Sequence, residues 1–225
     1  MNKKLILVIV EGRSDREALG SFFINNFSDD NVAIRVYNGD ITSGKKNTAE
    51  NIENKIESIV EEAMNLYGVT SKDVKNIIHL VDTDGTYIDD NLVVYNNKHK
   101  RAYYTEEGIK TSNPDQVKIR NNRKRNNLEI LLNIKNIFGV IPYNIYYLSA
   151  NLDHVLYDKM NCNSKEKVKS AISFSLKYRN DMEGFLNFLI NSSFSKCDDY
   201  EESWTFIKEN NNSLKRFSNL GICFK

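Results

Sequence analysis

Two largely apolar runs constrain the fold of this chain most strongly. Residues 5–10 read LILVIV and residues 77–81 read IIHLV, and β-branched side chains dominate both. Strands that are apolar on both faces are typical of a parallel sheet that is covered by helices on both sides. The two runs therefore predict buried strands of an α/β fold.

The segments around these runs extend the pattern. We expect strands at 5–10, 32–37, 77–81 and 143–148, with helices at 14–27, 48–67, 127–138 and from 151 to about 157. Ser14 or Asp15 is the expected N-cap of the first helix, and Gly68 and Gly139 are expected to end the second and third. Alternating strands and helices describe βαβ units, so we predict a mostly parallel four-stranded sheet flanked by helices.

Length and composition suggest how the chain is divided. A chain of 225 residues with 40% hydrophobic residues can form one domain with an extension. We expect an α/β domain at 1–160, which carries a polar and basic insert at about 89–125 with a short strand at 92–95. A helical C-terminal extension at 161–225 is expected to pack on this domain. The formal net charge is only +1, so any contact with nucleic acid must come from a local patch.

Cysteine usage and hydropathy bear on the compartment. Cys162, Cys197 and Cys223 are odd in number and far apart, which argues against a disulfide framework or a zinc site and fits a reducing cytoplasm. The apolar run at 5–10 is too short for a signal peptide, and no segment approaches the roughly 20 apolar residues that span a bilayer. We expect a soluble cytoplasmic protein that makes no membrane contact and is able to form a homo-oligomer.

Acidic residues follow two of the predicted strands. Glu11 comes directly after the first strand, and Asp82 and Asp84 follow the third. The carboxyl ends of parallel strands meet at one edge of the sheet, and a two-residue step keeps Asp84 on the side of Asp82 if the chain stays extended. Three carboxylates repel one another unless a hard cation such as Mg²⁺ neutralises them. In the alternative reading, Glu11 caps the next helix and the two aspartates lie in a solvated turn.

The segments LILVIVEGRSDREAL and HLVDTDG together resemble the Toprim family, which is marked by a glutamate after the first strand and a DxD motif after the third. The match covers roughly residues 4–150. The resemblance implies that Glu11 is a general acid or base and possible metal ligand, that Asp82 and Asp84 hold Mg²⁺ or Mn²⁺, and that Gly12 permits a tight turn. The family includes nucleases of phage defence, so we expect a metal-dependent nuclease that hydrolyses DNA or RNA phosphodiesters.

A fourth acid follows the last predicted strand. Some Toprim nucleases supply further acids for a second metal, and Asp153 in SANLDHV lies at the appropriate edge of the sheet. An acid in the first turn of a helix is an equally good interpretation of this residue. The neighbouring His154 is expected to be a polar helix residue rather than a ligand.

Basic residues are concentrated in the segment KIRNNRKR. The predicted contacts to nucleic-acid phosphates are Lys118, Arg120, Arg123, Lys124 and Arg125. The alternative is a solvated helix start, although cations are unfavourable at a helix N-terminus. Tyr103 and Tyr104, in the same insert, have rings that are able to stack on bases.

Two other functions remain open. The chain has no GxxxxGK[ST] motif, so a separate ATPase protein is a possible partner, and the chain is then a non-catalytic or partner-activated subunit of a defence complex. Alternatively, DTDGT resembles the first motif of haloacid-dehalogenase-type phosphatases, with Asp82 as nucleophile and Ser149 and Lys159 as further residues. That resemblance leaves Glu11 unexplained, and the only later acidic pair, Asp198 and Asp199, follows no buried strand.

Overall fold

The computed structural model describes residues 4–36, 40–196 and 198–225, so Tyr37 and Cys197 lie outside the described residues. The chain forms two compact units. The first comprises Met1–Val81 and Asn126–Tyr146, and the second comprises Asp82–Arg125 and Tyr147–Lys225. The sequence-based boundary at residue 160 falls inside the second unit and stays a prediction.

The first unit is built on a five-stranded sheet. Its elements are β1 (Leu5–Val10), α1 (Arg13–Asn26), β2 (Asn31–Val36), α2 (Ile52–Tyr67), the 3-10 helix η1 (Ser71–Asp73), β3 (Val74–Asp82), β7 (Asn136–Ile137) and β8 (Ile141–Leu148), the last residues of β3 and β8 belonging to the second unit. The strand order is β2-β1-β3-β8-β7, in which β1 is parallel to β2 and β3 while β7 and β8 are antiparallel. The expected α/β class is confirmed, but the sheet is mixed and has a fifth strand.

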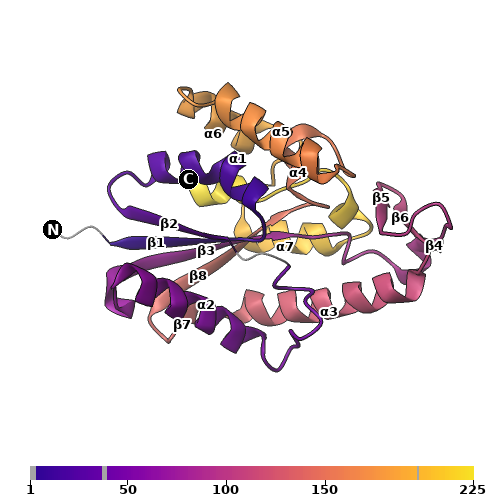
Figure 1. Ribbon diagram of the computed structural model, residues 1–225, viewed down its shortest axis with the longest axis horizontal. Helices are drawn as coiled ribbons and strands as arrows, with labels where there is room; N and C mark the ends of the chain where they lie inside the picture. The colour runs from indigo at the N-terminus through magenta and orange to yellow at the C-terminus, as the bar shows by residue number, and fades with distance from the viewer. Residues whose placement is uncertain (1–3, 37–39, 197) are drawn as a thin grey trace. The chain divides into compact units, whose positions relative to one another are not determined.

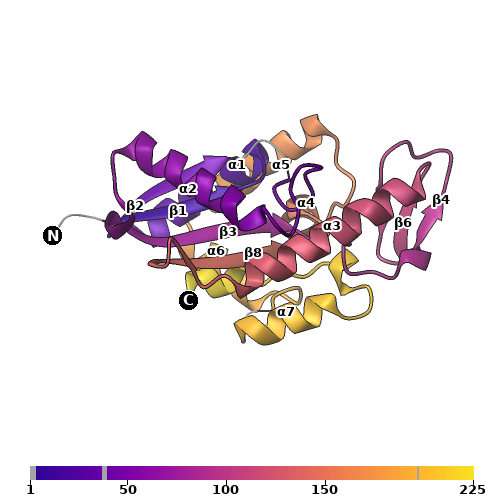
Figure 2. The same cartoon turned by 90° about the horizontal axis from the view of Figure 1, so that it is seen from below.

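Helices cover both faces of this sheet. Figures 1 and 2 show α1 on one face and α2 on the other. All six residues of β1 are buried, as expected for a strand between two helical layers. The buried side chains of α2 recur at helical spacing, from Ile52 and Ile56 to Ala63, and the helix ends at Gly68 in the left-handed conformation as predicted.

The start of α1 differs from the prediction. Its N-cap is Gly12 rather than Ser14 or Asp15, and α1 begins at Arg13. Asp15 occupies the third helical position, where its carboxylate accepts the backbone N–H of Gly12 at 2.8 Å. In this capping interaction the acid occupies the third helical position. Asp15 therefore lies inside the first turn of α1 and is not the predicted N-cap residue.

The third predicted helix is wrong in its bounds. Helix α3 spans Pro114–Asn133 and crosses from the second unit into the first, instead of covering 127–138. Asn113 accepts the backbone N–H of Gln116 at 3.2 Å, and proline is favoured at the first helical position, so the start signal is local. Gly139, with φ +68°, lies in the turn between β7 and β8 and does not end a helix.

The second unit combines a small sheet with helices. Its elements are the 3-10 helix η2 (Asp90–Leu92), β4 (Val93–Tyr95), β5 (Tyr103–Thr105), β6 (Gly108–Thr111), the first part of α3, α4 (Leu152–Tyr157), α5 (Ser164–Lys177), α6 (Met182–Asn191), α7 (Tyr200–Lys208), η3 (Asn212–Leu214) and η4 (Leu220–Phe224). The sheet order is β4-β6-β5, with β4 parallel and β5 antiparallel to β6. The predicted strand at 92–95 is confirmed as β4.

Two cores hold this unit together. Val93 and Ile109 of the small sheet pack with Val117 of α3 and with Leu214. Rings join the C-terminal helices, since Phe174 of α5 lies 6.3 Å from Phe185 of α6, centroid to centroid, in an edge-on arrangement. Helices α5, α6 and α7 confirm the helical character that the sequence predicts for the C-terminal part. No helix in the described part of the chain is long and apolar enough to cross a membrane.

Candidate active site

The DTDGT segment forms a tight turn at the end of β3. Asp82 is the last residue of the strand, and the backbone N–H of Thr86 closes the turn on the carbonyl of Thr83 at 2.9 Å. Asp84 and Gly85 both have left-handed backbones, with φ 51° and 66°. The chain is therefore not extended at Asp84, contrary to the premise of the sequence argument. Gly85 and Thr86 are part of this turn.

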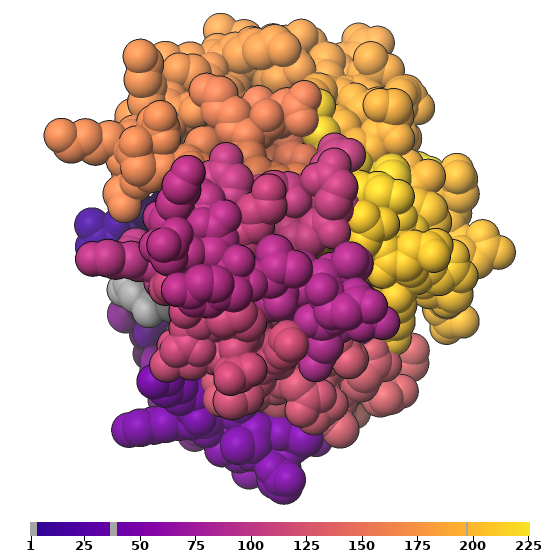
Figure 3. All heavy atoms as spheres, turned by 90° about the vertical axis from the view of Figure 1, so that its right-hand side faces the viewer, coloured from indigo at the N-terminus to yellow at the C-terminus, as the bar shows by residue number. Residues whose placement is uncertain are grey.

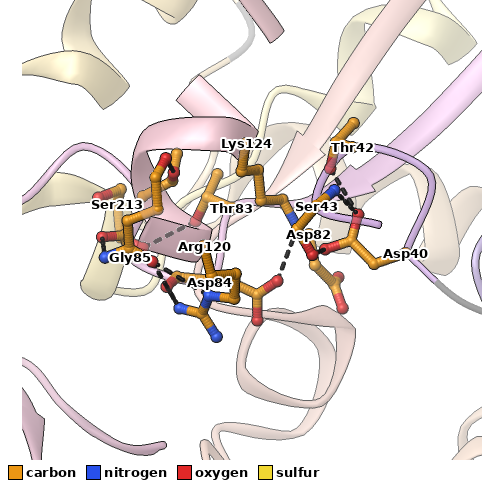
Figure 4. A network of polar contacts seen from close by, with 12 residues as sticks. Asp40, Thr42, Ser43, Asp82, Thr83, Asp84, Gly85, Arg120, Lys124 and Ser213 are labelled. Atoms are coloured by element: carbon orange, nitrogen blue, oxygen red, sulfur yellow. Dashed lines mark hydrogen bonds and ion pairs between the residues drawn. The ribbon is translucent and has the colours of Figure 1, made fainter. Parts of the chain in front are cut away.

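The turn is anchored to the rest of the second unit through its backbone. The N–H groups of Thr83 and Asp84 donate to the carbonyls of Leu148 and Ala150 at 3.0 and 2.8 Å, and the Thr83 hydroxyl donates to the Ser213 carbonyl at 2.7 Å. Figure 4 shows this turn beside Ser213 and the side chains of α3. A turn held on several sides gives its carboxylates defined positions.

Asp84 is bound on both of its carboxylate oxygens. The ammonium of Lys124 lies 2.6 Å from Oδ2, and the hydroxyl of Tyr104 donates to Oδ1 at 2.9 Å. Arg120 donates to the Tyr104 hydroxyl at 2.7 Å and to the Asp84 carbonyl at 2.9 Å. Burial, followed by the charge of Asp84, raises the pKa of Tyr104 well above its usual value, so this hydroxyl stays protonated.

Three of the five predicted phosphate contacts hold the turn in this structure. Lys124 is fully buried, and Arg125 donates from Nε and Nη2 to the Thr86 carbonyl at 3.3 and 2.9 Å, while Arg120 binds Asp84. The segment lies in the middle of α3, so the argument from cations at a helix N-terminus loses its premise. Lys118 and Arg123 are half-buried, and their contact with nucleic acid stays a prediction.

Asp82 and Asp84 line the same pocket, whose volume is about 680 Å³. The loop 98–104 of the insert forms another part of its wall, and Lys167 of α5 a further part. Asp82 is half-buried and accepts the backbone N–H of Leu152 at 3.0 Å. Figure 3 shows the insert at the surface beside the C-terminal segment. Two carboxylates thus face a hollow with cations on its rim, an arrangement suited to a phosphate ester and a divalent ion.

Asp153 is placed differently from the acids of the turn. It lies in the first turn of α4 with only 1% of its surface exposed, and its Oδ2 is 3.0 Å from the Lys167 ammonium. Among the described residues that line the pocket, Asp153 is absent. Its role as a metal ligand stays a prediction. The adjacent His154 is buried, and burial lowers the pKa of its imidazole.

Glu11 follows β1 in the first unit and is half-buried. Strands β1 and β3 are parallel neighbours, with Ile9 opposite His79. Glu11 is therefore the first residue beyond one strand, and Asp82 the last residue of the next. His79 itself is fully buried and shares a 2.7 Å hydrogen bond with the Tyr143 hydroxyl, so it is a core histidine.

Two parts of the site were not predicted from the sequence. Tyr104 was considered only as a ring for base stacking, although its hydroxyl bridges Asp84 and Arg120. Three of the four cations that line the pocket, Lys98, Lys100 and Arg101, precede the segment from which phosphate contacts were predicted. For Tyr104, alternation along a strand was the available signal, because adjacent residues of a strand alternate between its two sides and one of two neighbouring tyrosines is able to point inward.

Among the described residues, no three His, Cys, Asp or Glu side chains are grouped as a metal site. No protein-family model matches the chain, and neither does any curated protein or solved structure. The Toprim resemblance therefore depends on the two motifs and on what the site is able to do chemically.

Proposed function

We propose that this protein is a metal-dependent nuclease of the Toprim type that hydrolyses DNA or RNA phosphodiesters. The observation that carries the proposal is the pocket at the end of β3, in which Asp82 and Asp84 share a wall with the cationic loop 98–104. Cations bind the phosphates of nucleic acid, and carboxylates bind the divalent ion that phosphodiester hydrolysis commonly uses.

The carboxylates fit Mg²⁺ or Mn²⁺ to different degrees. Asp82 offers hard oxygen donors at the pocket wall, whereas both oxygens of Asp84 already bind Lys124 and Tyr104. In the proposal, Asp82 holds the ion, and Asp84 joins it only by exchanging one of its present partners. A bound divalent ion supplies positive charge to the phosphate and acidifies a coordinated water.

The protein residues have separate tasks in this proposal. Glu11 accepts the proton of the attacking water, and Asp82 orients the reacting centre from a turn whose backbone is anchored. Lys124 neutralises Asp84, which limits the repulsion between Asp84 and Asp82. Lys118 and Arg123 are the remaining members of the basic cluster for contacts to the nucleic-acid backbone.

Cleavage assays on plasmid DNA and on RNA test this function. With Mg²⁺ or Mn²⁺, the Glu11→Gln variant should lose at least about 100-fold in rate, the usual contribution of a positioned general base. The Asp82→Asn variant should also lose activity, because it removes a charged ligand of the ion. Glu17→Gln and Asp29→Asn are matched controls, because both positions are exposed carboxylates of the first unit. Equal rates in wild type, Glu11→Gln and Asp82→Asn would contradict the mechanism.

A partner-activated form of the same protein is a second candidate. Helix α5 exposes Val168, Ile172 and Leu176 by 50%, 47% and 60%, and they recur at helical spacing. Exposed apolar patches often mark protein contacts, so this stripe is the candidate docking surface for a separate subunit. Replacement of the three residues by serine should then abolish activation by that subunit without changing the basal cleavage rate.

The phosphatase alternative has less support. The Ser149 side chain is fully buried, and its hydroxyl donates to the backbone carbonyls of Asn212 and Lys215, so it does not present itself to a phosphate. Asp199 caps helix α7 by accepting the N–H of Glu202 at 2.8 Å. Turnover of para-nitrophenyl phosphate that disappears in Asp82→Asn would favour the phosphatase over the nuclease.

A further inference from the structure

The rim of the pocket has a pair of stacked rings. The centroids of His99 and Tyr103 are 4.2 Å apart with their planes inclined by 19°. His99 therefore covers one side of the Tyr103 ring, while 39% of the tyrosine remains exposed. Both residues line the pocket that Asp82 and Asp84 share.

Three cations lie between and beside the two rings in the sequence. Lys98, Lys100 and Arg101 are exposed and also line the pocket. The loop thus combines an aromatic surface with positive charge, the combination with which proteins bind single strands: charge attracts the backbone and rings stack on the bases.

Hydrogen bonds hold this loop at both ends. The N–H groups of Lys98 and His99 bind the side-chain and backbone oxygens of Asn96 at 3.0 and 3.2 Å, and the His99 carbonyl accepts the N–H of Ser112 at 2.7 Å. At the other end, Asn161 accepts from the Tyr104 N–H at 2.9 Å and donates to its carbonyl at 2.8 Å. A loop fixed before binding loses little conformational entropy when a ligand arrives.

The ring pair is coupled to the acidic turn through β5. Tyr104 extends its hydroxyl to Asp84, and the preceding Tyr103 lines the same pocket as both of them. Adjacent residues of one strand therefore position the carboxylate and the stacking surface, so a base on Tyr103 is bound within the pocket that contains the acids.

We propose that the pocket binds single-stranded nucleic acid, with an unpaired base on the Tyr103 ring and its flanking phosphates at Lys98, Lys100 and Arg101. The faces of the bases are covered in a duplex, so this mode of binding selects unpaired or extruded nucleotides. This proposal gives the substrate class of the proposed nuclease. It rests on the nuclease function only in assuming that the bound strand is cut.

Fluorescence anisotropy in the presence of EDTA tests binding separately from cleavage. The probes are short labelled oligonucleotides of mixed sequence: single-stranded DNA, single-stranded RNA and the corresponding duplexes. Wild type should bind one or both single strands more tightly than the duplexes, and Tyr103→Ala should weaken that binding by about 10-fold. Tyr103→Phe keeps the ring and should bind like wild type.

Two further variants separate the ring from the charge. Tyr95→Ala removes a tyrosine that is 69% exposed on β4 of the same small sheet, and it should leave binding unchanged. Replacing Lys98, Lys100 and Arg101 together by alanine should reduce the slope of log K against log salt by about 2, since each single-strand phosphate contact contributes about 0.7.

The outcomes distinguish the two proposals. Binding of single strands that depends on Tyr103 without any cleavage would overturn the nuclease and support this inference. Cleavage that prefers duplexes would overturn the inference but support the nuclease function. The same holds if the protein cleaves nucleic acid while wild type and Tyr103→Ala bind single strands equally well. Absence of binding to all four oligonucleotides by wild type also overturns the inference.

Discussion

The ammonium of Lys124 lies 2.6 Å from a carboxylate oxygen of Asp84, although none of the lysine side chain is exposed. Lysine is almost never fully buried unless it is paired. The pair joins the middle of α3 to the turn after β3, over 40 residues of sequence, and so links the basic segment to the acidic motif. Its position indicates that this part of the basic segment supports the turn rather than contacts a ligand.

Loss of one member of this pair should destabilise the protein. Lys124→Met leaves the Asp84 carboxylate without its cation, and removing one partner of a buried ion pair costs about 3–5 kcal/mol. Urea unfolding should show a midpoint well below that of wild type. Lys118→Met, on the same helix but only half-buried, should change the free energy of unfolding by about 0.5 kcal/mol or less.

A double-mutant cycle checks whether the two residues act as a pair. The loss of stability in Lys124→Met combined with Asp84→Asn should be smaller than the sum of the single losses, because each single variant leaves a charge unpaired. Additive losses would show that the two side chains do not interact in solution.

Much of the α/β core was predictable because its signals are local. The run LILVIV contains enough buried side chains to define β1, and Gly68 ends α2 where the apolar periodicity stops. Helix α3 was misplaced because its N-terminal half buries polar groups. Asn121 and Lys124 are buried in that half, and the buried leucines of the helix begin only at Leu128. Apolar periodicity therefore indicated only the second half of the helix.

The candidate site was predictable only in its acids. Asp82 and Asp84 follow a buried strand, which is a local pattern, and the structure places both on one pocket. The basic residues needed tertiary information. Two segments of similar composition, 98–101 and 118–125, lie in the same insert. The first lines the pocket. In the second, α3 packs against the turn and buries Lys124.

Gly85 should not tolerate a side chain. Its φ is +66°, and a Cβ built there would lie 2.5 Å from Cδ2 of Leu214. Gly139 has a nearly identical φ of +68° with no atom within 4 Å of the Cβ position, so Gly139→Ala measures the backbone cost alone, about 1 kcal/mol. Gly85→Ala should lose about 1–3 kcal/mol more through overpacking. Equal thermal shifts in the two variants would mean that Leu214 gives way without cost.

His154 should make folding sensitive to acid. Burial lowers the pKa of its imidazole, so the neutral form is favoured in the folded state. A histidine with a lowered folded pKa contributes stability above the unfolded value of about 6.5, and this contribution is lost as the pH falls through the folded value. Urea midpoints measured downward from about pH 7 should fall more steeply for wild type than for His154→Gln. Parallel curves would contradict the assignment.

Tyr104 should give the opposite dependence at alkaline pH. Its hydroxyl donates to Asp84, and burial together with that charge raises the pKa of the phenol above its unfolded value of about 10. A raised folded pKa means that this stability is fully present below about pH 10 and decreases as the pH rises towards the folded value, because only the unfolded chain ionises there. Tyr104→Phe removes the titrating hydroxyl and its hydrogen bonds, at a cost of about 1–3 kcal/mol near neutrality. The difference in unfolding free energy between wild type and Tyr104→Phe should therefore shrink from about pH 9 to 11. Urea unfolding at each pH measures this difference. A constant difference over that range would show that Asp84 and burial do not hold the hydroxyl in its protonated form.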